Sequence, residues 1–310
     1  MSAVIVDAHH HLWHLGGGYD WLDAPELAPI RRTFAPGQLR AELAAAGVSR
    51  TVLVEGGRCD ADEAAVLLEH AKATPEIAAV VAWADPADPD LAATLAGYAE
   101  LDGGGHLRGI RAQVQAEDVG YLDRDDVRAG LARIGAAGLV FDLVVRAEQL
   151  PSAGRAAAAL PGVRFVLDHL GKPRVRAGAE GLAEWCELVA GLAACPNVSA
   201  KLSGLVTEAD WAAWEVDDLR PYVEEALALF GPDRLMYGSD WPVCTLAASY
   251  AEVIDTLDGL IGRDDRAAVF GGTATAVYGL GSGTAGIEPG PESMGPDQTQ
   301  LDLPRRNRWH

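Results

Sequence analysis

The sequence is poor in cysteine, which excludes a fold held together by disulfides. Its 310 residues include four cysteines, and no two of them have the C-x-x-C spacing. These residues are Cys59, Cys186, Cys195 and Cys244. We expect reduced and mostly buried thiols in a cytoplasmic protein, because thiols stay reduced in that compartment.

Long apolar runs and an excess of basic residues are also absent. No stretch of about 18 apolar residues is present, so we expect no membrane-spanning helix. The amino terminus lacks a basic region followed by an apolar stretch, so we expect no secretory signal. Lys and Arg number 25 against 45 Asp and Glu, which gives a net charge of −20. Nucleic acid and anionic membrane surfaces are therefore not expected as partners.

The chain does contain enough apolar material for a large core. Hydrophobic residues make up 49% of the sequence, and the length allows one large domain or two ordinary ones. The expected partner is a small molecule, and assembly into a homo-oligomer is compatible with this composition.

Strand-like and helix-like segments alternate along the chain. The predicted strands cover residues 4–9, 51–55, 77–84, 107–114, 139–145, 164–169, 198–202 and 235–239. Amphipathic segments predict helices over 38–46, 60–73, 88–98, 125–136, 148–159, 182–193, 218–230 and 250–260. Eight such units in about 280 residues predict a (β/α)8 barrel, an α/β fold usually built from about 250 residues. A doubly wound open sheet is the alternative, although no G-x-G-x-x-G follows the first strand.

Two segments fall outside this repeat. Leu15–Thr33 forms a long loop after the first predicted strand. Such loops are often lids, and this one can also pack over the barrel mouth. Gly281–His310 is rich in Gly, Pro, Ser and Asp, which predicts a disordered tail. The expected organisation is a single barrel domain over residues 1–280 and a tail over 281–310.

The carboxyl ends of the strands are where such a barrel carries its working residues. The first predicted strand runs into His9, His10 and His11. Because side chains on a strand alternate, we expect His9 and His11 to share one face and His10 to point the other way. Two such imidazoles can share a divalent metal or point together at one substrate oxygen. The sixth strand delivers His169 and the eighth delivers Asp240 to the same end of the barrel.

Several motifs resemble the amidohydrolase superfamily, and more narrowly its amidohydrolase-related family 2. The motifs are Asp7–Trp13, Phe165–His169 with Gly171-Lys172-Pro173, and Tyr237–Pro242. The sugar-acid lactonase and pyrone-dicarboxylate lactonase branch is further resembled by Tyr19–Leu22, Gly109–Arg111, Gly138–Leu143 and Lys201–Leu205. The similarity covers about residues 4–280 in one order along the chain. It implies a (β/α)8 barrel that hydrolyses a ring ester.

Two departures from the metal-dependent relatives bear on the cofactor. The fifth predicted strand ends in Asp142–Val145 and supplies no histidine, and Arg111 occupies the region where a carboxylated lysine would stand. A site for two metals is therefore not expected. The resemblance leaves either one divalent ion, zinc, or a metal-independent site. The candidate ligands are His9, His11, His169 and Asp240.

These residues suggest a lactone hydrolase. In this hypothesis Asp240 accepts a proton from the attacking water and returns it to the leaving alkoxide. The three histidines stabilise the developing oxyanion, directly or through a metal. Candidates for substrate binding are Arg111, Lys201, Arg32 and Glu55 as polar partners, and Trp21 and Trp241 as stacking surfaces. The structural alternatives are ion pairs for Arg111, Glu55 and Lys201, and loop packing for the tryptophans.

Two rival functions fit the same sequence. One is a metal-dependent, non-oxidative decarboxylase on the same barrel, which would release carbon dioxide rather than an acid. The other is a barrel that binds a sugar acid without turning it over. The complete set of three histidines and Asp240 argues against the second rival, because a catalytically inactive relative tends to lose such residues.

Overall fold

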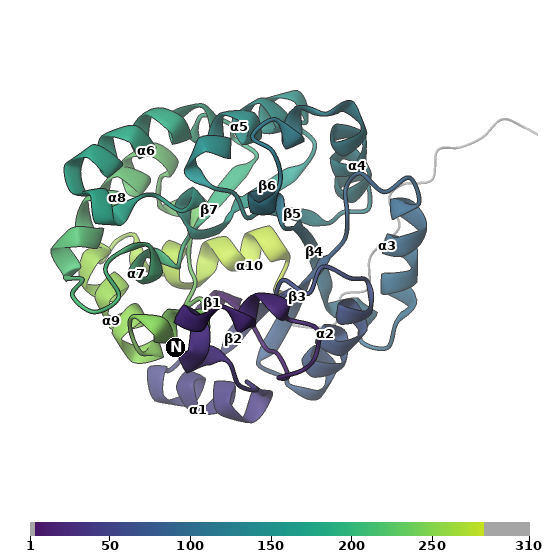
Figure 1. Ribbon diagram of the computed structural model, residues 1–310, viewed down its shortest axis with the longest axis horizontal. Helices are drawn as coiled ribbons and strands as arrows, with labels where there is room; N and C mark the ends of the chain where they lie inside the picture. Colours follow the sequence, from purple (N-terminus) through teal and green to yellow (C-terminus); the bar gives the residue numbers. More distant parts are fainter. Residues whose placement is uncertain (1–3, 282–310) are drawn as a thin grey trace, which may run out of the picture.

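The strands form a ring that follows the order of the sequence. The computed structural model describes residues 4–281, so the predicted tail lies outside the described residues apart from Gly281. Each strand pairs in parallel with the next one along the chain (Figure 1). The strands are β1 (Val6–His10), β2 (Arg50–Val54), β3 (Ile77–Trp83), β4 (Leu107–Ala112), β5 (Val140–Leu143), β6 (Arg164–Leu167), β7 (Val198–Leu202) and β8 (Leu235–Tyr237).

Backbone hydrogen bonds just beyond β8 close the ring against β1. The N–H of Asp240 donates to the His9 carbonyl at 2.8 Å, and the N–H of His11 donates to the Trp241 carbonyl at 2.7 Å. The predicted (β/α)8 barrel is confirmed, and the open doubly wound sheet is excluded.

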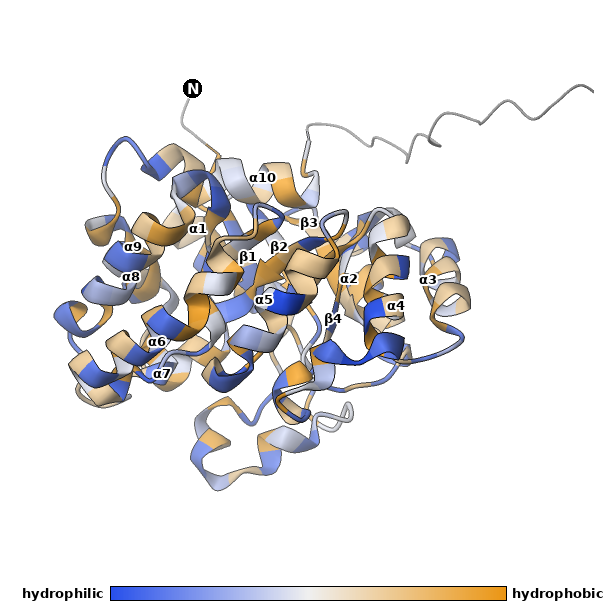
Figure 2. Cartoon of the chain, turned by 90° about the horizontal axis from the view of Figure 1, so that it is seen from above, coloured by the Kyte–Doolittle hydropathy of each residue, from blue (hydrophilic) through white to orange (hydrophobic). Residues whose placement is uncertain are grey.

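Helices connect the strands and surround the ring (Figure 1). They are α1 (Pro36–Ala46), α2 (Asp62–Ala73), α3 (Leu91–Glu100), α4 (Asp125–Ala136), α5 (Leu150–Ala159), α6 (Gly178–Ala193), α7 (Leu205–Glu208), α8 (Val216–Phe230), α9 (Tyr250–Leu260) and α10 (Thr273–Tyr278). Figure 2 shows hydrophilic and hydrophobic stretches interleaved along them, as expected when one face packs on the sheet and the other meets solvent. The predicted helical segments are all found, with ends displaced by a few residues.

Two apolar layers stabilise the barrel. The larger layer lies between the strands and the surrounding helices. The smaller one fills the interior with Val and Ala side chains from alternate strand positions, such as Val52 and Val54 of β2. Tyr278 of α10 belongs to this inner layer. Arg164, at the start of β6, donates to the Val277 carbonyl at 2.7 Å. Helix α10 therefore closes the end of the barrel where the strands begin.

Strand β1 contains an irregularity that decides which histidines enter the barrel. Ala8 lies in the inner layer, so regular alternation would turn His10 inward as well. The pairing with β2 shifts register between Asp7 and His10. After this shift, His10 Nε2 hydrogen-bonds with the Thr51 hydroxyl at 2.9 Å, whereas the Nε2 atoms of His9 and His11 meet at 3.1 Å. His10 is thus directed away from the other two.

The long loop after β1 is fastened to the barrel at several points. Trp13 and Phe34 exchange two backbone hydrogen bonds of 2.9 and 3.2 Å where the loop leaves and returns. Within the loop, the Trp21 indole N–H donates to the Gly56 carbonyl at 2.8 Å. Figure 1 shows this purple segment in front of β1–β3. These contacts favour packing over the barrel mouth, one of the two roles that the sequence left open.

The structure also bears on the expected free, buried thiols and on the expected lack of a membrane-spanning helix. All four cysteines are free, as predicted, but only Cys195 and Cys244 are buried, whereas Cys59 is exposed. Across residues 4–281, no helix combines the length and apolar character needed to cross a bilayer. The cytoplasmic location and the homo-oligomer stay predictions.

Candidate active site

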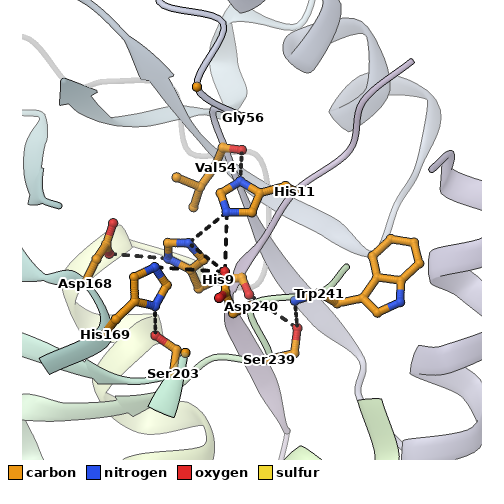
Figure 3. Close-up of polar contacts among 12 residues, drawn as sticks. His9, His11, Val54, Gly56, Asp168, His169, Ser203, Ser239, Asp240 and Trp241 are labelled. Atoms are coloured by element: carbon orange, nitrogen blue, oxygen red, sulfur yellow. Dashed lines mark hydrogen bonds and ion pairs between the residues drawn. The ribbon is translucent and has the colours of Figure 1, made fainter. Parts of the chain in front are cut away.

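Three imidazoles surround one carboxylate at the carboxyl end of the barrel (Figure 3). His9 belongs to β1 and His11 follows it, His169 follows β6, and Asp240 follows β8. The Oδ1 atom of Asp240 lies 3.7 Å from His9 Nε2, 3.5 Å from His11 Nε2 and 3.9 Å from His169 Nε2. All four side chains are buried. The structure therefore brings together the residues that the sequence nominated for catalysis or metal binding.

Hydrogen bonds on the far side of each ring orient these imidazoles. His11 Nδ1 lies 2.9 Å from the Val54 carbonyl. Because a carbonyl only accepts, Nδ1 carries a proton and donates it to this carbonyl, which fixes the orientation of the ring. His169 Nδ1 hydrogen-bonds with the Ser203 hydroxyl at 2.9 Å. Figure 3 shows both rings held in this way, with their Nε2 atoms facing the carboxylate.

Burial controls the charge of the cluster. It lowers the pKa of the His169 imidazole to about 4 and that of His9 well below its ordinary value. Burial acts to raise the pKa of Asp240, but the His169 and His11 imidazoles outweigh it and hold that pKa below the ordinary value. At neutral pH the site therefore presents uncharged His9 and His169 beside an ionised Asp240.

A buried ion network lies directly beneath His9. The Lys201 ammonium donates to Asp142 Oδ2 at 2.6 Å and lies 2.9 Å from Asp168 Oδ1. It also lies 3.1 Å from His9 Nδ1. Asp142 in turn accepts from the Tyr278 hydroxyl at 2.8 Å. Lys201 is completely buried. Lys201 is therefore paired with carboxylates, which is the structural alternative given above. Its ammonium is not placed to contact a substrate.

Arg111 and Glu55 form the next part of this network. Arg111 Nε donates to Glu55 Oε1 at 2.5 Å, and its Nη1 donates to Asp168 Oδ2 at 3.0 Å. Glu55 also accepts from the Gly57 N–H at 2.6 Å, which fixes the loop after β2. Arg111 and Glu55 thus form a structural ion pair, the alternative to substrate binding given above. Arg111 nevertheless borders the cavity.

A cavity of about 390 Å³ opens above the cluster. Its lining includes His11, His169, Asp240, Arg111 and Trp21 among the nominated residues. The other nominated residues lie elsewhere. Arg32 is exposed and stacks on Phe34, with 4.0 Å from its guanidinium carbon to the ring centroid. Trp241 is buried against the same ring at 5.2 Å and points away from Asp240 in Figure 3. Arg32, Trp241, Glu55 and Lys201 are thus outside the lining, and we do not retain them as substrate contacts.

Strained backbone is concentrated at this cavity. Within residues 4–281, the residues other than glycine with positive φ are Cys59, His169, Leu170, Lys172 and Asp240. All of them except Leu170 line the cavity. Left-handed backbone costs a residue with a side chain about 1–2 kcal/mol. Such conformations persist where the surrounding structure enforces them, and they cluster at functional sites.

Gly204 gives a direct test of how tightly His169 is held. Its φ is +64°, and a Cβ at this position would lie 2.6 Å from His169 Nδ1. We expect Gly204→Ala to displace the imidazole and to lower kcat/KM on the order of 10²-fold, because misplacement by about 1 Å has that effect. Gly138→Ala is the matched control, because φ is +75° there with no atom within 4 Å of the added carbon. It should lose stability without losing activity, and equal activity losses in the two variants would contradict this role.

The sequence places this site in a known family. Residues 6–280 match the family model described as amidohydrolase. The chain is a member of the amidohydrolase family.

Two relatives of this amidohydrolase carry the name L-fucono-1,5-lactonase. The one from Burkholderia multivorans is 38% identical over 294 residues, which span 90% of this chain and 97% of the relative. The one from Burkholderia ambifaria is 36% identical over 283 residues, which span 88% and 94%. A crystal structure of an amidohydrolase from Burkholderia multivorans with bound zinc matches with a TM-score of 0.84 and 36% identity, over 90% of this chain and all of that one (100%).

The donor atoms of His9, His11 and Asp240 lie close enough together to hold a single divalent ion. Ligands at about 2.0–2.2 Å in tetrahedral geometry place neighbouring donors about 3.3 Å apart. The separations from Asp240 Oδ1 of 3.5 to 3.9 Å are close to that value. Asp168 Oδ1 is buried, 2.9 Å from the Lys201 ammonium and 3.3 Å from His9 Nδ1. It can accept the Nδ1 proton of His9 and so leave Nε2 free as a ligand.

Several residues at the site were not nominated from the sequence, among them three with ionisable side chains, Lys172, Glu208 and Glu63. Lys172 and Glu208 line the cavity. Glu63 accepts from the Gly56 N–H at 2.8 Å and holds the loop after β2. The sequence did contain a reason to nominate Lys172, because it belongs to the Gly171-Lys172-Pro173 motif three residues after His169. Glu63 lies in the first turn of α2, and its contact with the loop after β2 could not be inferred from the spacing of residues along the sequence.

Proposed function

We propose that this amidohydrolase hydrolyses the ring ester of a sugar-acid lactone. The observation that carries the proposal is an ionised Asp240, held among three imidazoles at the floor of a polar cavity. The names of the Burkholderia relatives support the same reaction class and suggest L-fucono-1,5-lactone as a first substrate to test.

The protein groups divide the work as follows. Asp240 accepts a proton from the water that attacks the lactone carbonyl. Without a bound ion, His169 would present an Nε2 proton to the developing oxyanion when the Ser203 hydroxyl donates to its Nδ1. A divalent ion bound by His9, His11, His169 and Asp240 would supply a Lewis acid that polarises the carbonyl. We propose zinc, because imidazole and carboxylate donors suit it and a structurally similar amidohydrolase has bound zinc.

The cavity suits an uncharged, hydroxyl-rich substrate. Among the described residues that line it, Arg111 is already paired with Glu55 and Asp168. Lys172 forms no ion pair within residues 4–281, although the Glu208 carboxylate favours its charged form. Amide and hydroxyl groups of Gln113, Gln115 and Thr207 complete a lining that can bind hydroxyls. A dicarboxylate would find only the Lys172 ammonium free to balance its two charges, so a sugar lactone fits better than a pyrone dicarboxylate.

A substrate panel tests this function. Acid release would be followed with a pH indicator on aldono-1,5- and aldono-1,4-lactones and on 2-pyrone-4,6-dicarboxylate, with enzyme-free blanks for spontaneous opening. We expect kcat/KM of at least about 10⁴ M⁻¹s⁻¹ on one aldonolactone. Carbon dioxide release from aromatic acids would instead support the decarboxylase. A clear preference for the dicarboxylate would contradict the argument from cavity charge.

The pKa shifts predict an unusual pH profile. His169 has a pKa of about 4, and that of Asp240 lies below its ordinary value of 3.8. Both groups therefore keep their working charge as the pH falls from 7 to about 5. We expect kcat/KM for lactone hydrolysis to stay flat over this range. An inflection near 6.5, the ordinary histidine value, would show that an imidazole titrates as an exposed group and would contradict the assignment.

The donor set also predicts the metal content. We expect no more than one equivalent of divalent ion per chain, because Asp142 on β5 is engaged with Lys201 and supplies no further ligand. Elemental analysis of protein purified without chelator measures the stoichiometry. Activity lost to chelator and restored by zinc would support the Lewis-acid role. Two equivalents of metal would contradict the single-ion site.

A further inference from the structure

Lys172 is a cation at the cavity that the reaction described above does not use. Its ammonium donates to Gln115 Oε1 at 2.6 Å. Within residues 4–281 it forms no ion pair, whereas the Lys201 and Arg111 cations beneath the site are each bound to carboxylates. An ammonium has three donors, so two remain for a molecule in the cavity.

The backbone places Lys172 in the site at a conformational cost. His169, Leu170, Gly171 and Lys172 have φ values of 53°, 51°, 74° and 55°. The Lys172 N–H donates to the His169 carbonyl at 2.9 Å, which closes a left-handed turn. With about three residues per turn, residues three apart point to the same side. The turn thus directs His169 and Lys172 together into the cavity, and Pro173 follows directly. The left-handed backbone has a conformational cost at the three residues that carry a side chain, His169, Leu170 and Lys172, and such conformations cluster at functional sites.

The position of Lys172 suits a proton donor. Lys172 lines the same cavity as His169 and Asp240. The Gln115 amide oxygen takes one of its N–H bonds, and the other two can donate to a molecule bound there. A lysine ammonium can also give up a proton, whereas a guanidinium keeps its protons.

We propose that Lys172 is a further catalytic residue, the acid that protonates the ring oxygen as it leaves. The role rests on the proposed lactone hydrolysis. The oxygen of water bonds to the carbonyl carbon while its proton passes to Asp240. The ring carbon–oxygen bond then breaks, its electron pair goes to the ring oxygen, and that oxygen takes a proton from Lys172 Nζ. Proton transfer from Asp240 through water recharges the amine, and the product is a hydroxy acid.

The chemistry of the leaving group explains why a second acid helps. An alkoxide is strongly basic, so the bond to the ring oxygen breaks with difficulty unless a proton arrives as it breaks. Lys172 follows β6 and Asp240 follows β8, so the two groups reach the cavity from different strands. In the proposed reaction, Asp240 serves the attacking water and Lys172 serves the ring oxygen. A thiolate is much less basic and leaves without this assistance.

A matched pair of substrates tests the proposal. Lys172→Met would be assayed on the preferred aldonolactone and on its analogue with sulfur in place of the ring oxygen. We expect kcat/KM to fall on the order of 10²- to 10³-fold on the lactone and less than about 10-fold on the thiolactone. Lys172→Arg keeps the charge but not a releasable proton, so it should show the same selective loss. Lys72→Met, at an exposed lysine of α2, is the control for a lost lysine.

The outcomes separate this role from its alternatives. Equal losses on both substrates would show that Lys172 only binds substrate or supports the fold, and would overturn the proposal. Full activity of Lys172→Arg would assign an electrostatic role and would overturn it too. Wild-type protein that opens no lactone would overturn the lactonase function and this role together. Wild-type activity without the selective loss would overturn the role of Lys172 alone.

Discussion

Asp240→Asn is expected to lower kcat for lactone hydrolysis on the order of 10³-fold while the fold and substrate binding stay nearly intact. The amide keeps the shape of the carboxylate but removes the basic oxygen. That oxygen, Oδ1, lies within 3.9 Å of the Nε2 atoms of three histidines and at the cavity floor. The measurement is kcat and KM on the preferred aldonolactone, together with a thermal melt to show that the variant folds.

A second carboxylate in the same cavity provides the control. Glu208→Gln removes a charge from the lining without touching the imidazoles. We expect it to change kcat much less than Asp240→Asn, with its main effect on KM. If Asp240→Asn kept more than about a tenth of the wild-type rate, Asp240 would not be the base.

Lys201→Met is expected to cost about 3–5 kcal/mol in the free energy of unfolding, because it leaves buried carboxylates without their cation. Lys201 is wholly buried, and its ammonium contacts Asp142, Asp168 and His9. Asp168 keeps its pairing with Arg111, so the main loss falls on Asp142. Urea-induced unfolding of wild type and variant gives the difference.

Two further variants identify the cause of that loss. Adding Asp142→Asn to Lys201→Met removes the uncompensated charge and should recover part of the stability, since the Tyr278 hydroxyl can still bond the amide. Lys72→Met removes an exposed lysine paired with Asp102 and should change stability by less than about 1 kcal/mol. A loss below about 1 kcal/mol for Lys201→Met would mean that the buried network contributes little.

Much of the fold was predictable because it depends on local patterns. Apolar strands alternate with amphipathic helices, and a parallel sheet of such units buries both faces of every strand. The family motifs added the lactonase resemblance and the positions of His9, His11, His169 and Asp240. Their convergence follows from a general property of barrels, in which the carboxyl ends of all strands meet at one face.

The sequence predicted correctly that His9 and His11 face each other, but the structural cause is not simple alternation along the strand. Alternation within His9–His11 predicted the right pair, but alternation continued from Ala8 would have turned His10 inward. A register shift between Asp7 and His10 resolves this conflict. The shift depends on pairing with β2, which is distant in sequence, so a reading of β1 alone does not contain it.

By itself, the sequence determined the barrel, the family and the residues that gather around Asp240, since each depends on local periodicity or on short motifs. Only the tertiary structure decided which polar residues are available to a substrate. Glu55, Arg111 and Lys201 stand at the ends of three separate strands, β2, β4 and β7, yet they form one buried ion network because Asp142 and Asp168 arrive on other strands. Lys172 reaches the cavity through a left-handed turn that its local sequence does not favour. Pairing of charges and the enforcement of strained backbone both depend on groups far apart along the chain, and only the folded barrel brings these groups into contact.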